Sequence, residues 1–102
     1  MATNAVARIN VRYGRLAEFN DAMERLLPIM ADRGWRLVAS YQTLIGNFHE
    51  VYDIWELPSA DGIGADMLAA AMDARFGSIG EALANSVESE TLSVVAKTPF
   101  SP

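Results

Sequence analysis

Two side chains of this sequence are suited to moving a proton, the carboxyl group of Asp53 and the imidazole of His49. Asp53 interrupts the otherwise apolar run Val51-Tyr52-Asp53-Ile54-Trp55, where an unpaired carboxylate is costly to bury. His49 is the only histidine, and the ordinary pKa of imidazole, about 6.5, suits a proton shuttle. Because His49 stands between two predicted strands, beside Asn47 and Glu50, the sequence favours a solvated loop histidine over a catalytic one.

Asp53 needs a partner, and the first predicted strand offers Arg8 and Arg12. A sheet that places the first strand beside the third brings either arginine within reach, and the resulting buried ion pair would serve only to fix strand register. Alternatively, Asp53 is a base or a ligand acceptor with a perturbed pKa, and Trp55, two residues on, supplies an aromatic wall on the same face. The sequence leaves both interpretations open.

Polar and aromatic residues on the predicted strands are candidates to orient a ligand. They are Arg8, Asn10, Arg12, Gln42 and Trp55. Because neighbouring residues of a strand point to opposite faces, only one of Tyr41 and Gln42 can reach a given face, and the same holds for Tyr52 and Asp53.

Several other chemistries are disfavoured. The chain has no cysteine, one histidine and no calcium-loop or zinc-protease motif, so we expect neither a metal site nor a cofactor. A net charge of −5, with the basic residues scattered, argues against nucleic acid and anionic membrane surfaces as partners. The N-terminus does not resemble a secretion signal and no apolar run is long enough to span a bilayer, so we expect a cytoplasmic protein.

The elements that position these residues follow from the hydrophobic periodicity. Alternation predicts a strand over 5–12, and a helical period predicts a helix from Leu16 to Gly34 that Pro28 bends. Two strand-like runs, 35–45 and 50–57, form a hairpin; a second helix, divided near Gly77 and Gly80, extends from 59 to 87, and a last strand covers 91–97. The order βαββαβ over a single domain, 1–102, predicts an α+β ferredoxin-like fold, with a four-stranded antiparallel sheet and both helices on one face.

The second face of that sheet is predicted to mix apolar and polar side chains. Val6, Val38 and Val95 stand among Arg8, Asn10, Arg12, Ser40 and Gln42. A solvated face would be nearly all polar, so we expect this face to be covered, most simply by an identical subunit.

A set of spaced residues extends over about the first 60 positions: Tyr13-Gly14, Phe19, Pro28, Gly34, Leu37-Val38, Gly46, the run from His49 to Trp55, and Ser59. In these residues the sequence resembles the NIPSNAP family of dimeric α/β-barrel proteins. The resemblance implies a homodimer whose two sheets face each other as a barrel. Relatives with similar patterns act as cofactor-free monooxygenases, cyclases or isomerases.

Two functional hypotheses follow. In the first, a hydrophobic small molecule binds in the barrel interior, the polar second face orients it, and Asp53 or His49 moves a proton without a metal or flavin. In the second, the chain is a non-catalytic dimeric module that binds a ligand or a protein, and its polar residues set only the strand register. The size of the interior cavity distinguishes the two.

Overall fold

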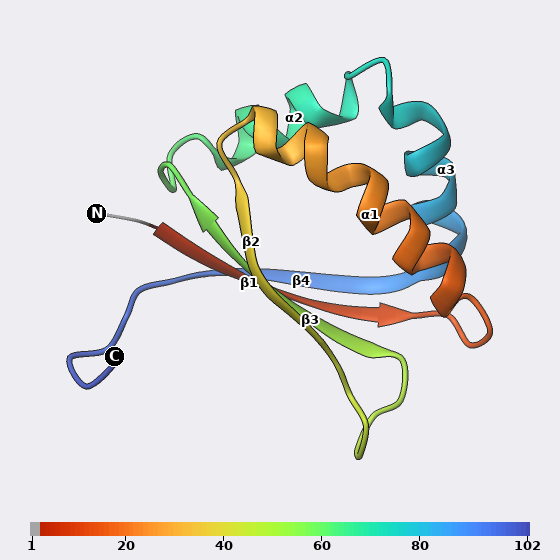
Figure 1. Ribbon diagram of the computed structural model, residues 1–102, viewed down its shortest axis with the longest axis horizontal. Helices are drawn as coiled ribbons and strands as arrows, with labels where there is room; N and C mark the ends of the chain where they lie inside the picture. Colours follow the sequence, from red (N-terminus) through yellow and green to blue (C-terminus); the bar gives the residue numbers. More distant parts are fainter. Residues whose placement is uncertain (1–2) are drawn as a thin grey trace.

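All the helices of the chain lie on one face of a four-stranded antiparallel sheet (Figure 1). The computed structural model describes residues 3–102. The elements, in chain order, are β1 Thr3–Val11, α1 Leu16–Asp32, β2 Arg36–Gln42, β3 Glu50–Leu57, α2 Ile63–Ala71, α3 Phe76–Ser86 and β4 Val87–Val95. The predicted α+β ferredoxin-like class is confirmed, with three helices in place of two.

The strands lie in the order β2-β3-β1-β4, so the predicted pairing of the first strand with the third is confirmed. Residues opposite each other in an antiparallel pair project to the same face, which defines the two faces of this sheet. The helix-side face carries Ala5, Ala7, Ile9 and Val11 of β1 and Val51, Asp53, Trp55 and Leu57 of β3. The open face carries Asn4, Val6, Arg8 and Asn10 of β1 and Glu50, Tyr52, Ile54 and Glu56 of β3.

An irregularity at Val38 changes which side chains of β2 share a face. Leu37 pairs with Trp55, but Ala39 pairs with Ile54, so one extra residue is inserted between them. Such a bulge reverses the alternation for the rest of the strand. Ser40 and Gln42, predicted for the second face, therefore lie on the helix-side face.

The second helical region is divided earlier than its glycines predict. α2 ends at Ala71 and α3 begins at Phe76, ahead of both Gly77 and Gly80. The break falls at Asp73, whose carboxylate accepts hydrogen bonds from the backbone N–H and the guanidinium of Arg75. Because a short acidic side chain competes for local backbone donors in this way, it favours a turn over a continuous helix.

The connection from α1 to β2 is a tight glycine turn. Gly34 has a φ of +83°, the left-handed conformation that glycine adopts most easily. Its N–H bonds to the carbonyl of Ala31, and the N–H of Trp35 bonds back to Met30, the pattern of a Schellman motif. A Cβ at Gly34 would stand 2.8 Å from the ring of Pro58. The turn directs Trp35 back beneath the helices.

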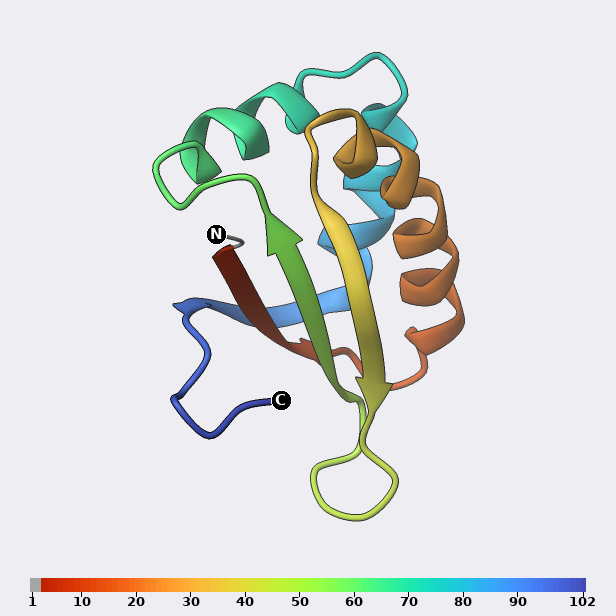
Figure 2. The same ribbon diagram turned by 60° about the vertical axis from the view of Figure 1, so that its left-hand side comes forward.

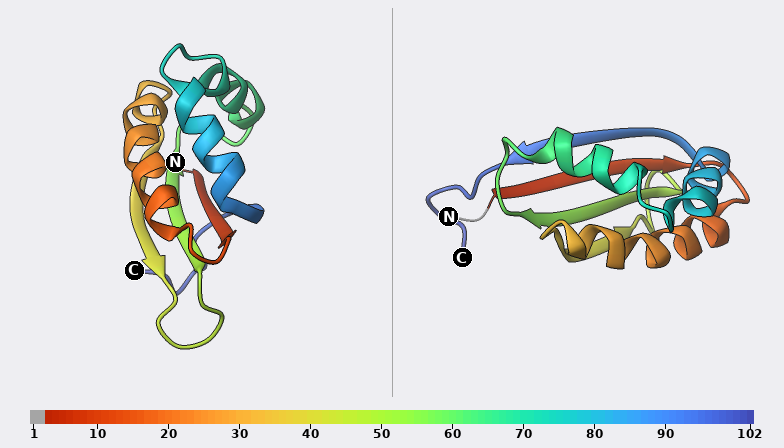
Figure 3. Two further views of the ribbon diagram at one scale, coloured as in Figure 1. Left: turned by 90° about the vertical axis from the view of Figure 1, so that its right-hand side faces the viewer. Right: turned by 90° about the horizontal axis from the view of Figure 1, so that it is seen from above.

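The buried apolar residues form two clusters between the helices and the sheet. One gathers around Trp35, Trp55 and Ile29, and the other around Ile9, Phe19 and Val51. The tip of the β2–β3 hairpin and the C-terminal tail project away from this body (Figures 1 and 2). Seen from the end and from above, the sheet has helices on one side only (Figure 3). Among residues 3–102, no helix is long and apolar enough to cross a membrane.

Candidate functional site

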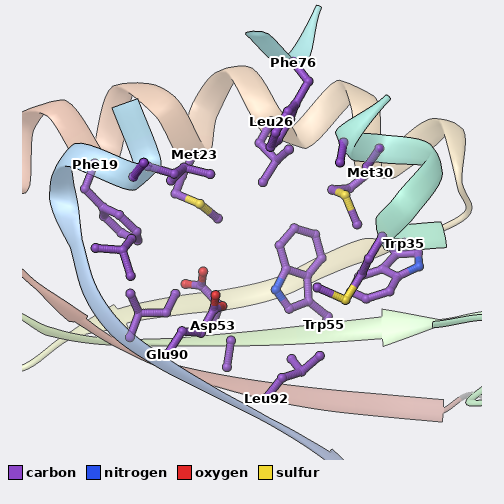
Figure 4. Close-up of a pocket in the computed structure, with 18 residues that line it drawn as sticks. Phe19, Met23, Leu26, Met30, Trp35, Asp53, Trp55, Phe76, Glu90 and Leu92 are labelled. Atoms are coloured by element: carbon purple, nitrogen blue, oxygen red, sulfur yellow. The ribbon is translucent and has the colours of Figure 1, made fainter. Parts of the chain in front are cut away.

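A large cavity lies between the helix-side face and the helices. Its volume is about 680 Å³, which is within the range of small-molecule sites. α1 crosses above it and the strands form its floor (Figure 4), while α2 and α3 contribute further lining residues, of which Met67, Ala71 and Ala84 are exposed at its open side. The lining comprises Ala7, Ile9, Phe19, Met23, Leu26, Met30, Trp35, Asp53, Trp55, Met67, Ala70, Ala71, Phe76, Leu83, Ala84, Val87, Glu90 and Leu92.

Small side chains explain why this space stays open. Alanine stands at the centre of the floor, at Ala7, and on the helices at Ala70, Ala71 and Ala84. Protein interiors normally pack as densely as organic crystals, so a hollow of this size that extends from the surface into the apolar core is unusual. The remaining wall is formed largely by methionine, leucine and aromatic side chains, and methionine adapts readily to irregular shapes.

Asp53 is the buried acid of the cavity floor. Only 2% of its surface is exposed, and it stands on β3 opposite Ala7. Ser40 Oγ of β2 donates a hydrogen bond to Asp53 Oδ1 at 2.5 Å. Burial raises the pKa of Asp53, and the hydrogen bond from Ser40 opposes part of that rise.

Glu90 is a second acid that faces the same cavity, from β4. It pairs with Ile9, two residues along β1 from Ala7, the partner of Asp53, and the carboxyl groups of Glu90 and Asp53 lie near each other (Figure 4). Glu90 stays accessible because β4 is an edge strand. Desolvation, followed by the charge of Asp53, raises the pKa of Glu90.

The sequence did not identify Glu90 as a cavity residue, because the last strand was predicted over 91–97 and Glu90 precedes it. The strand in fact begins at Val87. Glu90 then shares a face with Leu92, two residues on, and this alternation was the available signal.

Two tryptophans form the aromatic end of the cavity. The rings of Trp35 and Trp55 meet edge to face, with centroids 5.8 Å apart. Trp35 Nε1 donates a hydrogen bond to Asp66 Oδ2 of α2 at 3.0 Å, which ties that helix to the start of β2. The indole nitrogen of Trp55 faces the cavity on the side of Asp53 (Figure 4). The predicted placement of Trp55 on the same face as Asp53 is confirmed.

A smaller hollow of about 260 Å³ lies between α1 and β2. Phe19, Met23 and Asp53 line both this hollow and the main cavity, whereas Ser40 lines this hollow but not the main cavity. The Ser40–Asp53 pair thus stands where the two spaces adjoin.

The predicted ion pair between Asp53 and Arg8 or Arg12 is wrong. Arg8 lies on the open face, opposite Tyr52, whereas Asp53 faces the helices. Arg8 Nε instead pairs with Glu50 Oε2 at 3.2 Å. Arg12 lies beyond the end of β1 and is exposed. The error arose because face and register were inferred from composition, and β3 has apolar residues on both faces.

Glu50 is the centre of a polar network on the open face. Besides Arg8, it accepts hydrogen bonds from the Tyr52 hydroxyl and from Asn47 Nδ2. Asn10 extends the network to Ser89 with a hydrogen bond of 3.0 Å. The hydrogen bond from Tyr52 is the largest cause that lowers the pKa of Glu50. Desolvation opposes it, and Arg8 and Asn47 lower the pKa by smaller amounts.

The sequence-predicted site residues are therefore divided between two faces. Arg8 and Asn10 lie on the open face, Asp53 and Trp55 line the cavity, and Gln42, at the exposed end of β2, lines neither hollow.

His49 is in the hairpin connection, as predicted, but it is half-buried. Its φ of +66° is unusual for a residue with a side chain, and its ring packs on Tyr13 with centroids 4.9 Å apart. Within residues 3–102 its buried Nδ1 has no hydrogen-bond partner. His49 and Asp53 are not brought together. Over the same range, no group of three or more potential metal ligands gathers.

Comparison with known proteins gives a consistent result. A family model described as NIPSNAP matches residues 6–102. None of the curated proteins is a significant match.

Three solved structures show the same fold. A NIPSNAP family protein of unknown function from Agrobacterium tumefaciens has a TM-score of 0.84 and 19% identity, covering 99% of this chain and 92% of that one. A NIPSNAP domain protein from Burkholderia xenovorans has a TM-score of 0.81 and 16% identity, covering 98% of each chain. A Bordetella bronchiseptica protein described as a candidate antibiotic biosynthesis monooxygenase has a TM-score of 0.74 and 17% identity, covering 95% of this chain and 97% of that one.

Proposed function

This chain belongs to the NIPSNAP family, and on that premise we propose that it is a homodimeric protein that binds a hydrophobic small molecule in the cavity between its helices and its sheet. The observation that carries this proposal is the cavity itself. A space of about 680 Å³ with apolar and aromatic walls and two convergent carboxyl groups is the kind of site that small ligands occupy. The ligand would therefore lie within one subunit, not between the two sheets.

The polar groups of the cavity suit proton transfer. Asp53 stands in apolar surroundings that raise its pKa, and proteins prepare carboxyl groups for acid–base chemistry in this way. We propose that Asp53 exchanges protons with the bound ligand, as an isomerase or cyclase requires. Proton transfer is preferred here to oxygen insertion because the groups that converge on the cavity are carboxylic acids.

The open face supports the homodimer. Its central row, Ala39, Ile54, Val6 and Ser93, is mainly apolar, and Tyr41 remains 60% exposed beside it. An apolar row at the centre of a sheet with a polar network at one end favours coverage by a partner surface, and a second copy of the chain is the partner that is always available.

Binding is tested by filling the cavity. Ala84→Trp places an indole in the cavity from α3, whereas Asn85→Trp places one on the exposed surface of the same helix. With 2-(2-naphthyl)ethanol as the probe, calorimetry should show binding to the parent chain and to Asn85→Trp, and about 10-fold or greater weakening for Ala84→Trp because the indole excludes the probe. Equal binding by both variants would contradict the proposed site.

Catalysis is tested separately from binding. The protein should accelerate the exchange of the methyl hydrogens of 2-acetylnaphthalene for deuterium in D₂O, followed by NMR, because that exchange needs a base beside the bound ketone. Asp53→Asn should retain probe binding and reduce the acceleration about 100-fold or more. If the parent protein binds the ketone without accelerating exchange, the chain is the non-catalytic binding module.

A further inference from the structure

Within residues 3–102, the charged side chains that line the cavity are all acidic and all come from the sheet. Asp53 and Glu90 are the only titratable side chains that line it within residues 3–102, and they come from β3 and β4. α1, α2 and α3 contribute only apolar and aromatic lining residues. The two carboxyl groups therefore lie near each other, and no cationic side chain is among the residues that line the cavity within residues 3–102 (Figure 4).

The arginines that form ion pairs are engaged on the outside of the molecule. Arg8 pairs with Glu50 on the opposite face of the sheet, and Arg25 on α1 pairs with Asp21. Arg75, near the break between α2 and α3, pairs with Asp32. A buried carboxylate such as that of Asp53 is expensive without a counter-ion, so this arrangement leaves the missing positive charge to the ligand.

Aromatic rings stand beside the two acids. The Trp55 ring borders the same part of the cavity floor as Asp53, and Phe19 overhangs the acids from α1 (Figure 4). Aromatic faces attract organic cations, most strongly where water is excluded. Asp53 Oδ1 is held by Ser40, which fixes the orientation of the carboxyl group before a ligand arrives.

We propose that the ligand is an organic cation, a hydrophobic body that carries a basic nitrogen, with its ammonium group bound between Asp53 and Glu90 and its apolar part against Trp55 and the methionines. The inference rests on the proposed function, because it names the class of ligand for the same cavity. Anionic ligands, such as fatty acids, are rejected because their carboxylate would meet two further carboxyl groups and no cationic side chain among the lining residues.

Three probes that share one naphthalene body test the proposal. They are 2-(2-naphthyl)ethylamine, 2-(2-naphthyl)ethanol and 2-naphthylacetic acid, compared by calorimetry at pH 7. The amine should bind about 10-fold or more tightly than the alcohol, and the acid about 10-fold or more weakly, because only the amine supplies the counter-charge. If the alcohol binds as tightly as the amine, the inference is wrong and the hydrophobic site stands. If none of the three binds, the proposed function itself fails.

Substitutions of Asp53 and Glu90 test whether these two acids cause the preference for the amine over the alcohol. Glu90→Gln alone, and together with Asp53→Asn, should reduce the preference for the amine while the affinity for the alcohol changes less than about threefold. Glu88→Gln, exposed on the same strand and outside the cavity, removes an equal charge and should keep the preference. Loss of the preference in Glu88→Gln as well would mean that overall charge attracts the amine, which overturns the proposal.

A pH titration of the parent protein tests the same point without relying on the fold of a variant. A primary amine stays protonated well above pH 8, so its binding should weaken as the pH falls and Asp53 and Glu90 take up protons, while binding of the alcohol stays constant. Amine binding that does not change between pH 4 and pH 8 would contradict the role of the carboxyl groups.

Discussion

Glu50 and Asp53 lie three residues apart on β3, and their side chains enter opposite electrostatic environments because an odd separation on a strand places them on opposite faces. Glu50, on the open face, is surrounded by Arg8, Tyr52 and Asn47, which lower its pKa. Asp53, on the helix-side face, has one hydroxyl partner and an apolar cavity, and burial raises its pKa. The same strand thus carries a stabilised carboxylate and a carboxyl group that favours its protonated form.

The contrast between Glu50 and Asp53 indicates where catalytic or binding groups are found in a small sheet protein. A carboxylate such as that of Glu50, whose hydrogen-bond and ion-pair partners belong to the chain itself, needs no ligand. It contributes to the structure of the open face. A buried carboxyl group without a counter-ion costs stability, and such groups cluster at functional sites. We therefore propose separate roles for the two faces, association on one and ligand binding on the other.

The largest effect is expected from a substitution that disrupts the proposed dimer contact on the open face. Ile54→Asp places a charge at the centre of the apolar row opposite Val6, and we expect it to weaken dimerisation about 100-fold or more because the charge would be buried without a partner. Light scattering should then give the mass of one chain. Probe binding in the cavity should remain.

Leu68→Asp is the matched control for that experiment. Leu68 is also apolar and exposed, at 62%, but it lies on α2, away from the open face. A parent protein that is already a monomer at micromolar concentration, or an Ile54→Asp protein that stays dimeric, would contradict the separation of roles.

Asp53→Asn should stabilise the fold at neutral pH. The pKa of Asp53 is higher in the folded chain than in the unfolded chain, so its favourable contribution is complete below the unfolded value of 3.8 and is lost as the pH rises through the folded pKa. The uncharged amide avoids that loss. Urea unfolding should give similar free energies for parent and variant near pH 4, and a more stable variant at pH 8. A variant that is less stable at pH 8 would show that the carboxylate has a counter-ion.

Glu50→Gln should show the opposite pH dependence. The pKa of Glu50 is lower in the folded chain, so its contribution is present above the unfolded value of 4.5 and is lost as the pH falls through the folded pKa. The variant should be less stable than the parent at pH 7, and the two unfolding free energies should converge under acid conditions. If the two carboxyl variants shift stability in the same direction at pH 7, the contrast between the faces does not hold.

The smallest effect is expected from Ser40→Ala. Losing the hydrogen bond to Asp53 Oδ1 should lower the unfolding free energy by about 1 kcal/mol, and more at high pH than at low pH because the bond favours the ionised form. NMR titration should show a higher pKa for Asp53 in the variant. The neighbouring substitution Tyr41→Phe, on the other face of β2, should leave that pKa unchanged.

The sequence predicted the fold well because its signals are local. Alternation in β1 and β3 and the helical period of α1 each depend on a few neighbouring residues, and β3 was predicted with the bounds that it has. The identification of Asp53 as the anomalous residue needed only its apolar neighbours.

The site was harder to predict because it depends on long-range geometry. The bulge at Val38 leaves no clear signal in the sequence, yet it decides the faces of Ser40 and Tyr41. The partner of Asp53 was misassigned because composition alone does not show which face of β3 meets the helices. Glu90 comes from the far end of the chain, and only the sheet order brings it beside Asp53.

Mapping a bound probe by NMR is the most direct test of a ligand site between the helices and the sheet. When 2-(2-naphthyl)ethylamine is added to ¹⁵N-labelled protein, we expect the largest chemical-shift changes at the indole N–H of Trp55 and the amides of Ala7, Asp53 and Ala84. The amides of Tyr41 and Ile54, on the open face, should be unchanged. Shifts concentrated on the open face, with Trp55 unaffected, would contradict a ligand site between the helices and the sheet.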